Sequence, residues 1–137
     1  RHSLKWIGYF KTSQRLSLIT RVEFGNVKGS EIPPHLQFFL GGAESFLGLN
    51  FQERAGRNVH MIQLGAQYEF LTNRYVIARC NIGNTFDTWE FFYPFDDYLT
   101  GGGVTMGMAT PIGPIEVTLM SGSQRRLQGY LNIGYKF

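Results

Sequence analysis

The sequence predicts an all-β fold, an antiparallel up-and-down transmembrane β-barrel to which this chain contributes about seven strands. Three observations predict it. Apolar and polar residues alternate over several segments of strand length, short and long connections alternate along the chain, and no apolar run approaches the roughly 18 residues that a membrane helix requires. The 17 glycines and the 15% aromatic content also suit many strands joined by turns.

The last eleven residues show the alternation most clearly. Their apolar face comprises Leu127, Gly129, Leu131, Ile133, Tyr135 and Phe137. Their other face comprises Gln128, Tyr130, Asn132, Gly134 and Lys136. A strand between lipid and an aqueous lumen needs one fully apolar face, so this segment is predicted to be a membrane-facing strand.

Six further strands precede this one. They are expected at residues 4–10, 15–24, 59–70, 75–83, 104–109 and 115–120. In most of them every second residue belongs to an apolar face, as Ile62 and Leu64 do. The first strand is ambiguous because Trp6 and Ile7 fall on opposite faces, and its orientation stays open.

The connections alternate in length. Short turns are expected at residues 11–14, 71–74 and 110–114, and long loops at about 25–58 and 84–100. Outer-membrane barrels have short turns at one end and longer loops at the other, whereas a soluble sandwich has no reason to sort its loops by end. Aromatic residues also gather near the short-turn or terminal ends, as an interfacial girdle would: Tyr68, Phe70, Tyr75, Tyr135 and Phe137.

Both long loops have unusual compositions. The middle of the first, HLQFFLGGAESFLGLNF, is apolar enough to fold back into the barrel. The second, at 84–100, mixes aromatic and acidic residues. Packing of its aromatic residues on each other, or seating at the membrane surface, is favoured over contact with a ligand.

The strand face opposite the apolar one carries charged and amide side chains. These are Arg21, Glu23, Gln63, Gln67, Glu69, Arg79, Asn81 and Glu116. Such a set lines either an open pore or a solvated, cross-paired lumen, and the second arrangement is the commoner one.

Several other functions find no support in the residues. The net charge of +3 is small and scattered, so no nucleic-acid partner is expected. A single cysteine, Cys80, forms no internal disulfide or thiolate metal site and is expected on the lipid face. The histidines His2, His35 and His60 lack metal or triad spacing, and no G-x-S-x-G motif is present. We expect no catalytic site, metal or cofactor in this segment.

The residues also carry a family resemblance. The segment of residues 101–119, with its TPIGPIEVTL core, and the final YLNIGYKF resemble the last strands of the BamA-type superfamily, the bacterial surface antigen barrels of the outer membrane. The resemblance spans nearly the whole chain. It implies that residues 1–137 are the C-terminal part of a larger barrel domain, and that Tyr135 and Phe137 form a terminal signal for the outer-membrane assembly machinery.

A second motif resembles the inward-folded loop of that family. The segment FFLGGAESFLGL matches its pattern at Gly41, Gly42, Ser45 and Gly48, but Leu47 stands where the family has an arginine. The family's aspartate on a neighbouring strand, two residues before a glycine, is here Asn81 before Gly83. Both halves of a lumen ion pair are thus replaced together, which is physically coherent because a buried arginine without its carboxylate is costly.

The resemblance implies a barrel that inserts, exports or anchors polypeptides at the bacterial outer membrane. The relaxed loop motif favours a translocator or anchor for an attached domain such as a patatin-like phospholipase, and an enzymatic domain upstream is compatible with it. The implied partners are outer-membrane lipid, the assembly machinery, and upstream strands or a second copy, because seven strands leave two open edges. Two alternatives stay open: a soluble β-barrel that binds an apolar ligand in its core, and a small acyl hydrolase that uses His60.

Overall fold

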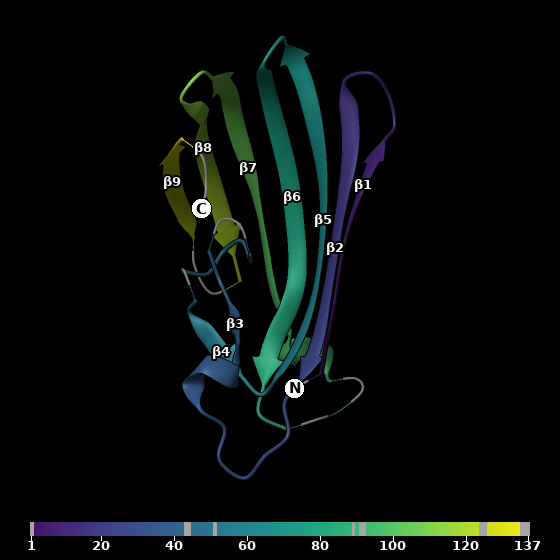
Figure 1. Cartoon of the computed structure of the whole chain (residues 1–137), viewed down its shortest axis with the longest axis vertical. Coiled ribbons are helices and arrows are strands. Elements are labelled where there is room, and N and C mark those ends of the chain that lie inside the picture. Colours follow the sequence, from purple (N-terminus) through teal and green to yellow (C-terminus); the bar gives the residue numbers. More distant parts are fainter. Residues whose placement is uncertain are drawn as a thin grey trace.

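Seven long strands form one antiparallel sheet in the computed structural model of the chain, which describes residues 2–42, 45–50, 52–88, 90, 93–123 and 126–134 (Figure 1). The strands are β1 (His2–Lys11), β2 (Leu16–Asn26), β5 (Asn58–Leu71), β6 (Arg74–Phe86), β7 (Leu99–Thr110), β8 (Gly113–Gly122) and β9 (Leu127–Ile133). Their order in the sheet follows their order in the chain. The predicted all-β, up-and-down architecture of seven strands is therefore confirmed.

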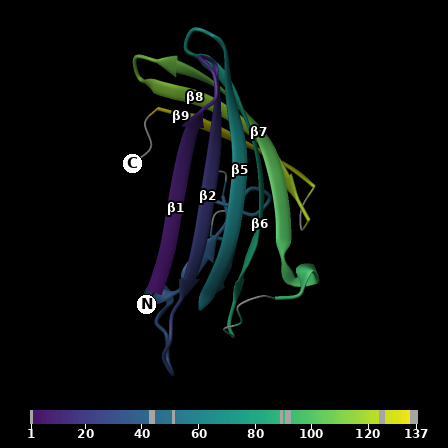
Figure 2. The same ribbon diagram turned by 90° about the vertical axis from the view of Figure 1, so that its right-hand side faces the viewer.

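The sheet is curved but not closed (Figure 2). Its edge strands are β1 and β9, and neither has a second partner strand among the residues described. The three short turns lie together at one end of the sheet and the long connections lie at the other (Figure 1). The tight turns use residues that tolerate left-handed backbone, with φ of 61° at Asn73 and 111° at Gly113.

The first long connection contains regular structure that the sequence did not predict. A 3-10 helix, η1 (Pro34–Leu36), precedes a small hairpin of β3 (Phe38–Leu40) and β4 (Arg54–Gly56). Strands of three residues are too short to show an alternating pattern, so periodicity could not reveal them. The second connection is shorter than expected because β6 continues to Phe86 and β7 begins at Leu99, and it contains the 3-10 helix η2 (Phe95–Asp97).

One face of the sheet, called here the outer face, is apolar and exposed. Leu64, Met106 and Leu131 are 53%, 57% and 66% exposed, and they belong to three different strands. The opposite, inner face carries the polar set predicted for the lumen. This is the inverse of a soluble barrel, which buries its apolar face, and it argues against a soluble barrel with an apolar core.

Strand pairing settles the orientation of β1 and corrects one expectation. Trp6 pairs with Val22 and lies on the outer face, whereas Ile7 pairs with Arg21 and lies on the inner face. Tyr75, expected in the aromatic girdle, instead points inward, where its hydroxyl donates a hydrogen bond to Glu116 at 2.5 Å. Tyrosine carries a polar group that seeks a partner, and the inner face supplies a carboxylate.

No helix among the residues described is long and apolar enough to cross a membrane.

Candidate functional site

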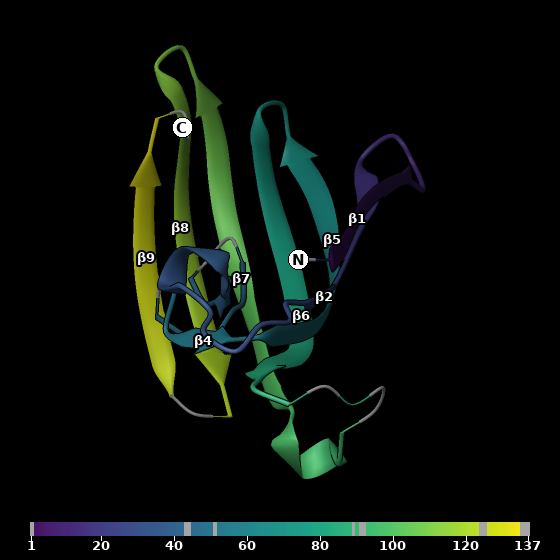
Figure 3. The ribbon, with the colours of Figure 1, turned by 60° about the horizontal axis from the view of Figure 1, so that its bottom comes forward.

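The candidate site is the inward loop, defined here as residues 38–56, which lies across the inner face of the sheet over β7 and β8 (Figure 3). Five of its described apolar side chains are almost fully buried, whereas Phe39 is exposed: the buried ones are Phe38, Leu40, Phe46, Leu47 and Leu49. Each such burial contributes about 1.5–3 kcal/mol. The prediction that this segment folds back onto the sheet is confirmed for the residues described.

Packing at the base of the loop forms the hydrophobic core of the molecule. The loop residues Phe38 and Leu40 pack with Val59 and Met61 of β5 and with Leu99 of β7. The loop is therefore attached to the sheet at its base by apolar contacts.

Asn81 of β6 holds the tip of the loop through two hydrogen bonds to the main chain of Leu47. The Leu47 N–H donates to Asn81 Oδ1 at 3.0 Å, and Asn81 Nδ2 donates to the Leu47 carbonyl oxygen at 3.3 Å. Both residues are buried. Asn81 and Leu47, which the sequence resemblance predicts to be neighbours, are thus in contact through a neutral amide and a main chain.

Glycines on β7 and β8 let the loop approach the sheet closely. A Cβ atom at Gly101 would lie 1.8 Å from the Leu47 carbonyl oxygen, and one at Gly122 would lie 3.0 Å from the Gly48 Cα atom. Gly101 pairs with both Asn81 and Gly122 in the sheet. Asn81, Gly101 and Gly122 therefore form a continuous row across three strands, and the tip of the loop rests on this row.

The loop is held in shape by its own glycines. Gly41 has φ of 132°, and a Cβ atom there would lie 1.9 Å from the Asn50 carbonyl oxygen. The N–H groups of Ser45 and Phe46 both donate to the Gly42 carbonyl oxygen, at 3.1 and 3.0 Å. Gly48 also has a positive φ, of 91°. These conformations favour glycine, which explains the G-G-x-x-S-x-L-G spacing.

The remaining predicted site residues are not part of this contact. Gly83 lies against β5, where a Cβ atom would come within 2.3 Å of the His60 carbonyl oxygen. Tyr135 and Phe137, predicted as the terminal assembly signal, lie outside the residues described.

Between the loop and the short-turn end, polar side chains of the inner face bond to one another, one pair within a strand and two between neighbouring strands. Arg21 and Glu23 form an ion pair at 3.3 Å. Arg79 donates to Thr105 at 3.0 Å, and Thr105 lies 2.8 Å from the hydroxyl of Thr118. Arg21, Arg79 and Thr105 are among the residues that border a hollow of about 350 Å³ on the inner face.

Gly101 and Gly122 are site residues that the alternating pattern alone does not reveal. In the sequence, the GGG segment of residues 101–103 predicts only a strand that begins with small residues. Gly101 contacts the loop tip because the strand register places it beside both Asn81 and Gly122. A glycine on the inner face of each of two adjacent strands is the signal that points to a close backbone approach.

Comparison with known proteins identifies the family. The family model of the OMP85 superfamily matches residues 5–137, nearly the whole chain. No curated protein matches the sequence closely enough to be a relative. The family match agrees with the up-and-down sheet, the exposed apolar face and the inward loop described above. The OMP85 superfamily is associated with the insertion and translocation of proteins at the bacterial outer membrane, and the chain belongs to that superfamily.

Proposed function

We propose that this chain forms one part of the wall of an outer-membrane barrel that exports or anchors an attached polypeptide domain, such as a patatin-like phospholipase. In this proposal the inward loop narrows the interior of the barrel. The observation that carries it is the lock between Asn81 and the main chain of Leu47, which fixes the loop against the wall.

The lock bears on which role the barrel has. Replacement of the family's arginine and aspartate does not release the loop, so the altered motif is no argument against an insertase. The contact between Asn81 and the main chain of Leu47 places no charged side chain at the loop tip. The hydrogen bonds of a buried neutral amide to main-chain atoms do not depend on salt concentration or on changes of pH near neutrality. A permanently seated loop suits a barrel that holds one attached domain better than a barrel that opens repeatedly for many clients.

Closure of the wall is part of the same proposal. Among the residues described, the outward edges of β1 and β9 have no partner strand, and each unpaired N–H or C=O group there costs several kcal/mol in hydrocarbon. We therefore infer that further strands, or a second copy of this chain, pair with both edges in the membrane.

The role is tested with a reporter. A folded reporter domain is fused before residue 1, and the fusion is expressed together with whatever strands close the wall. An exporting or anchoring barrel displays the reporter in a membrane-bound form that protease added to intact cells removes. It should also fail to restore outer-membrane protein assembly in cells depleted of their insertase. Restored assembly without reporter display would contradict the proposal and indicate an insertase.

Closure by a second copy is tested by cross-linking. Cysteines replace Trp6 on β1 and Gly129 on β9 in a Cys80→Ala background, and the protein is oxidised in the membrane. The two substitutions are made in separate proteins, and a disulfide-linked dimer that forms only when both proteins are present shows that β1 of one copy meets β9 of another. Failure to cross-link between copies, with an intact barrel in the full gene product, assigns closure to other strands of the same polypeptide.

A further inference from the structure

Arg74 lies on the outer face of the sheet, at the end where the short turns are. It is the first residue of β6 and pairs with Leu71 of β5 and Met108 of β7. Met108 belongs to the exposed apolar face, so the register places Arg74 on that face as well. Among the strand residues that the structure describes, Arg74 is the only Lys, Arg, Asp or Glu on the outer face. Its charge therefore stands at the boundary of the apolar band.

Arg74 lines a groove of about 230 Å³ on this face. The other residues that line the groove are Phe70, Met106, Gly107, Met108 and Ile115. Met106 and Met108 are exposed, so the groove is continuous with the apolar surface of the sheet. The groove thus combines one cationic group with an apolar lining.

No carboxylate forms an ion pair with Arg74 among the residues described. The ion pair found in this part of the chain joins Arg21 and Glu23 on the inner face. Glu69, which precedes the same turn, accepts a hydrogen bond from the Asn73 N–H at 3.3 Å. Arg74 itself is exposed, and the N–H groups of a guanidinium match two oxygens of a phosphate group. Arg74 is therefore placed to bind an anionic group from outside the sheet.

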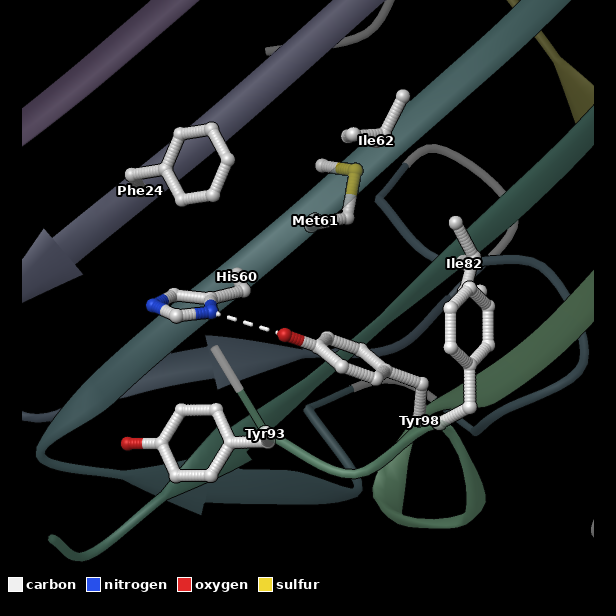
Figure 4. Close-up of a pocket in the computed structure, with 8 residues that line it drawn as sticks. Phe24, His60, Met61, Ile62, Ile82, Tyr93 and Tyr98 are labelled. Carbon is white, nitrogen blue, oxygen red and sulfur yellow. Dashed lines mark hydrogen bonds between the residues drawn. The ribbon is translucent and has the colours of Figure 1, made fainter. Parts of the chain in front are cut away.

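The opposite end of the outer face differs in its chemistry. The hollow beside His60 is lined by aromatic and apolar side chains among the residues described, and none of these is Lys or Arg. His60 Nδ1 there lies 3.2 Å from the Tyr98 hydroxyl, as drawn in Figure 4. Of the two hollows, only the groove at Arg74 offers partners for both a phosphate group and a hydrocarbon chain.

The position of Arg74 along the strand fits the surface of a bilayer. Short turns of outer-membrane barrels face the periplasm. The lipids of the leaflet on that side are glycerophospholipids, which carry a phosphate group directly above their acyl chains. Arginine is costly at the centre of a bilayer and tolerated near its surface, where its guanidinium reaches the level of the phosphate groups.

We propose that Arg74 binds the phosphate group of one glycerophospholipid of the periplasmic leaflet, and that one acyl chain of this lipid follows the groove along Phe70, Met106 and Ile115. Pockets for whole small molecules usually measure about 300–1,000 Å³. The groove of about 230 Å³ therefore holds the first part of one chain, and the rest of the lipid stays in the bilayer.

The test is retention of lipid by the full protein in native mass spectrometry. The protein is reconstituted in vesicles of phosphatidylethanolamine and phosphatidylglycerol, then released in a detergent that strips loosely bound lipid. Wild-type protein is expected to keep one phospholipid. Arg74→Gln should lower the retained fraction at least about tenfold, because hydrogen bonds to a charged group are lost. Ile115→Trp fills the groove, keeps the charge and should also lower the retained fraction.

Two variants serve as matched controls. Arg15→Gln removes a basic residue from another short turn, outside the groove, and Leu119→Trp adds a large ring to the outer face away from the groove. Both should keep the lipid. Inorganic phosphate supplied without lipid should leave no adduct on the wild-type protein. Circular dichroism and heat-dependent gel mobility verify that each variant is folded.

Four results would overturn the proposal: no phospholipid on wild-type protein, equal retention by Arg74→Gln, an equal loss in the two controls, or a phosphate adduct without lipid that Arg74→Gln removes. The inference rests on the outer face lying in lipid and on the short turns facing the periplasm, not on the role of the barrel. Reporter display should be unchanged in Arg74→Gln, so the two proposals can fail independently.

Discussion

At the scale of single residues, the contact between Asn81 and Leu47 shows how the inward loop is held against the sheet without charged side chains. A buried arginine left without a carboxylate would cost about 3–5 kcal/mol, so the loss of one charge requires the loss of the other. Asparagine keeps a hydrogen-bond acceptor and gains a donor. It can therefore satisfy both the N–H and the C=O of Leu47, which a carboxylate cannot do.

The first prediction concerns this lock. Asn81→Ala leaves two buried main-chain groups of Leu47 unsatisfied, at about 1–3 kcal/mol for each group. Hydrogen exchange of the inward loop should become faster while exchange in β5 and β6 changes little. Gln67→Ala, on the same inner face but away from the loop, serves as the control. Unchanged exchange in Asn81→Ala would show that the apolar packing holds the loop without the lock.

The second prediction compares two neighbouring glycines. Gly101→Ala places a methyl group against the Leu47 carbonyl oxygen and should lift the loop tip, with faster proteolysis at residues 45–50. At Gly102 the same methyl points to the outer face, where the nearest atom is 3.2 Å away. Gly102→Ala should therefore cost much less than Gly101→Ala and should leave proteolysis at residues 45–50 unchanged. Equal rates of proteolysis in both variants would contradict the contact between the loop tip and Gly101.

The sequence predicted which residues face inward better than it predicted what they contact. Arg21, Glu23 and Asn81 could be assigned because side chains alternate with a period of two. The partner of Asn81 could not, because it is a main-chain group on a loop far away in the sequence. Tyr75 was misplaced because an aromatic residue near a turn fits a girdle and a lumen equally well.

At the scale of elements, the two faces of each strand differ in what they tolerate. In β5, Leu64 is on the outer face and Gln67 is on the inner face. The sequence predicted all seven strands of the sheet because their residues alternate between an apolar face and a polar face. Strand ends were predicted less well, and β6 continues to Phe86 because pairing with β5 extends to Asn58.

The third prediction follows from this difference. Leu64→Arg places a charge in hydrocarbon and should lower the free energy of unfolding in vesicles by about 2–4 kcal/mol. Gln67→Arg places the same charge beside the interior and should have a much smaller effect. Urea denaturation of the vesicle-bound protein, followed by tryptophan fluorescence, measures both. Equal losses would contradict the assignment of the faces.

At the scale of the whole molecule, the sheet distributes polar and apolar residues in the opposite way to a soluble protein. Its exposed band is apolar, its inner face is polar and cross-paired, and its core lies where the inward loop meets the sheet. This polarity is what a bilayer requires and what water disfavours. The outer face of the sheet is therefore expected to lie in lipid.

The reactivity of Cys80 distinguishes an outer face that lies in lipid from one that meets water. Cys80 is exposed on the outer face near the middle of β6, and thiols react as thiolates, which hydrocarbon disfavours. In vesicles, a charged, membrane-impermeant maleimide should leave Cys80 unlabelled until the protein is unfolded. Gln67→Cys in a Cys80→Ala background should be labelled in the folded protein. Rapid labelling of Cys80 in the folded, vesicle-bound protein would show that this face meets water and would contradict the account.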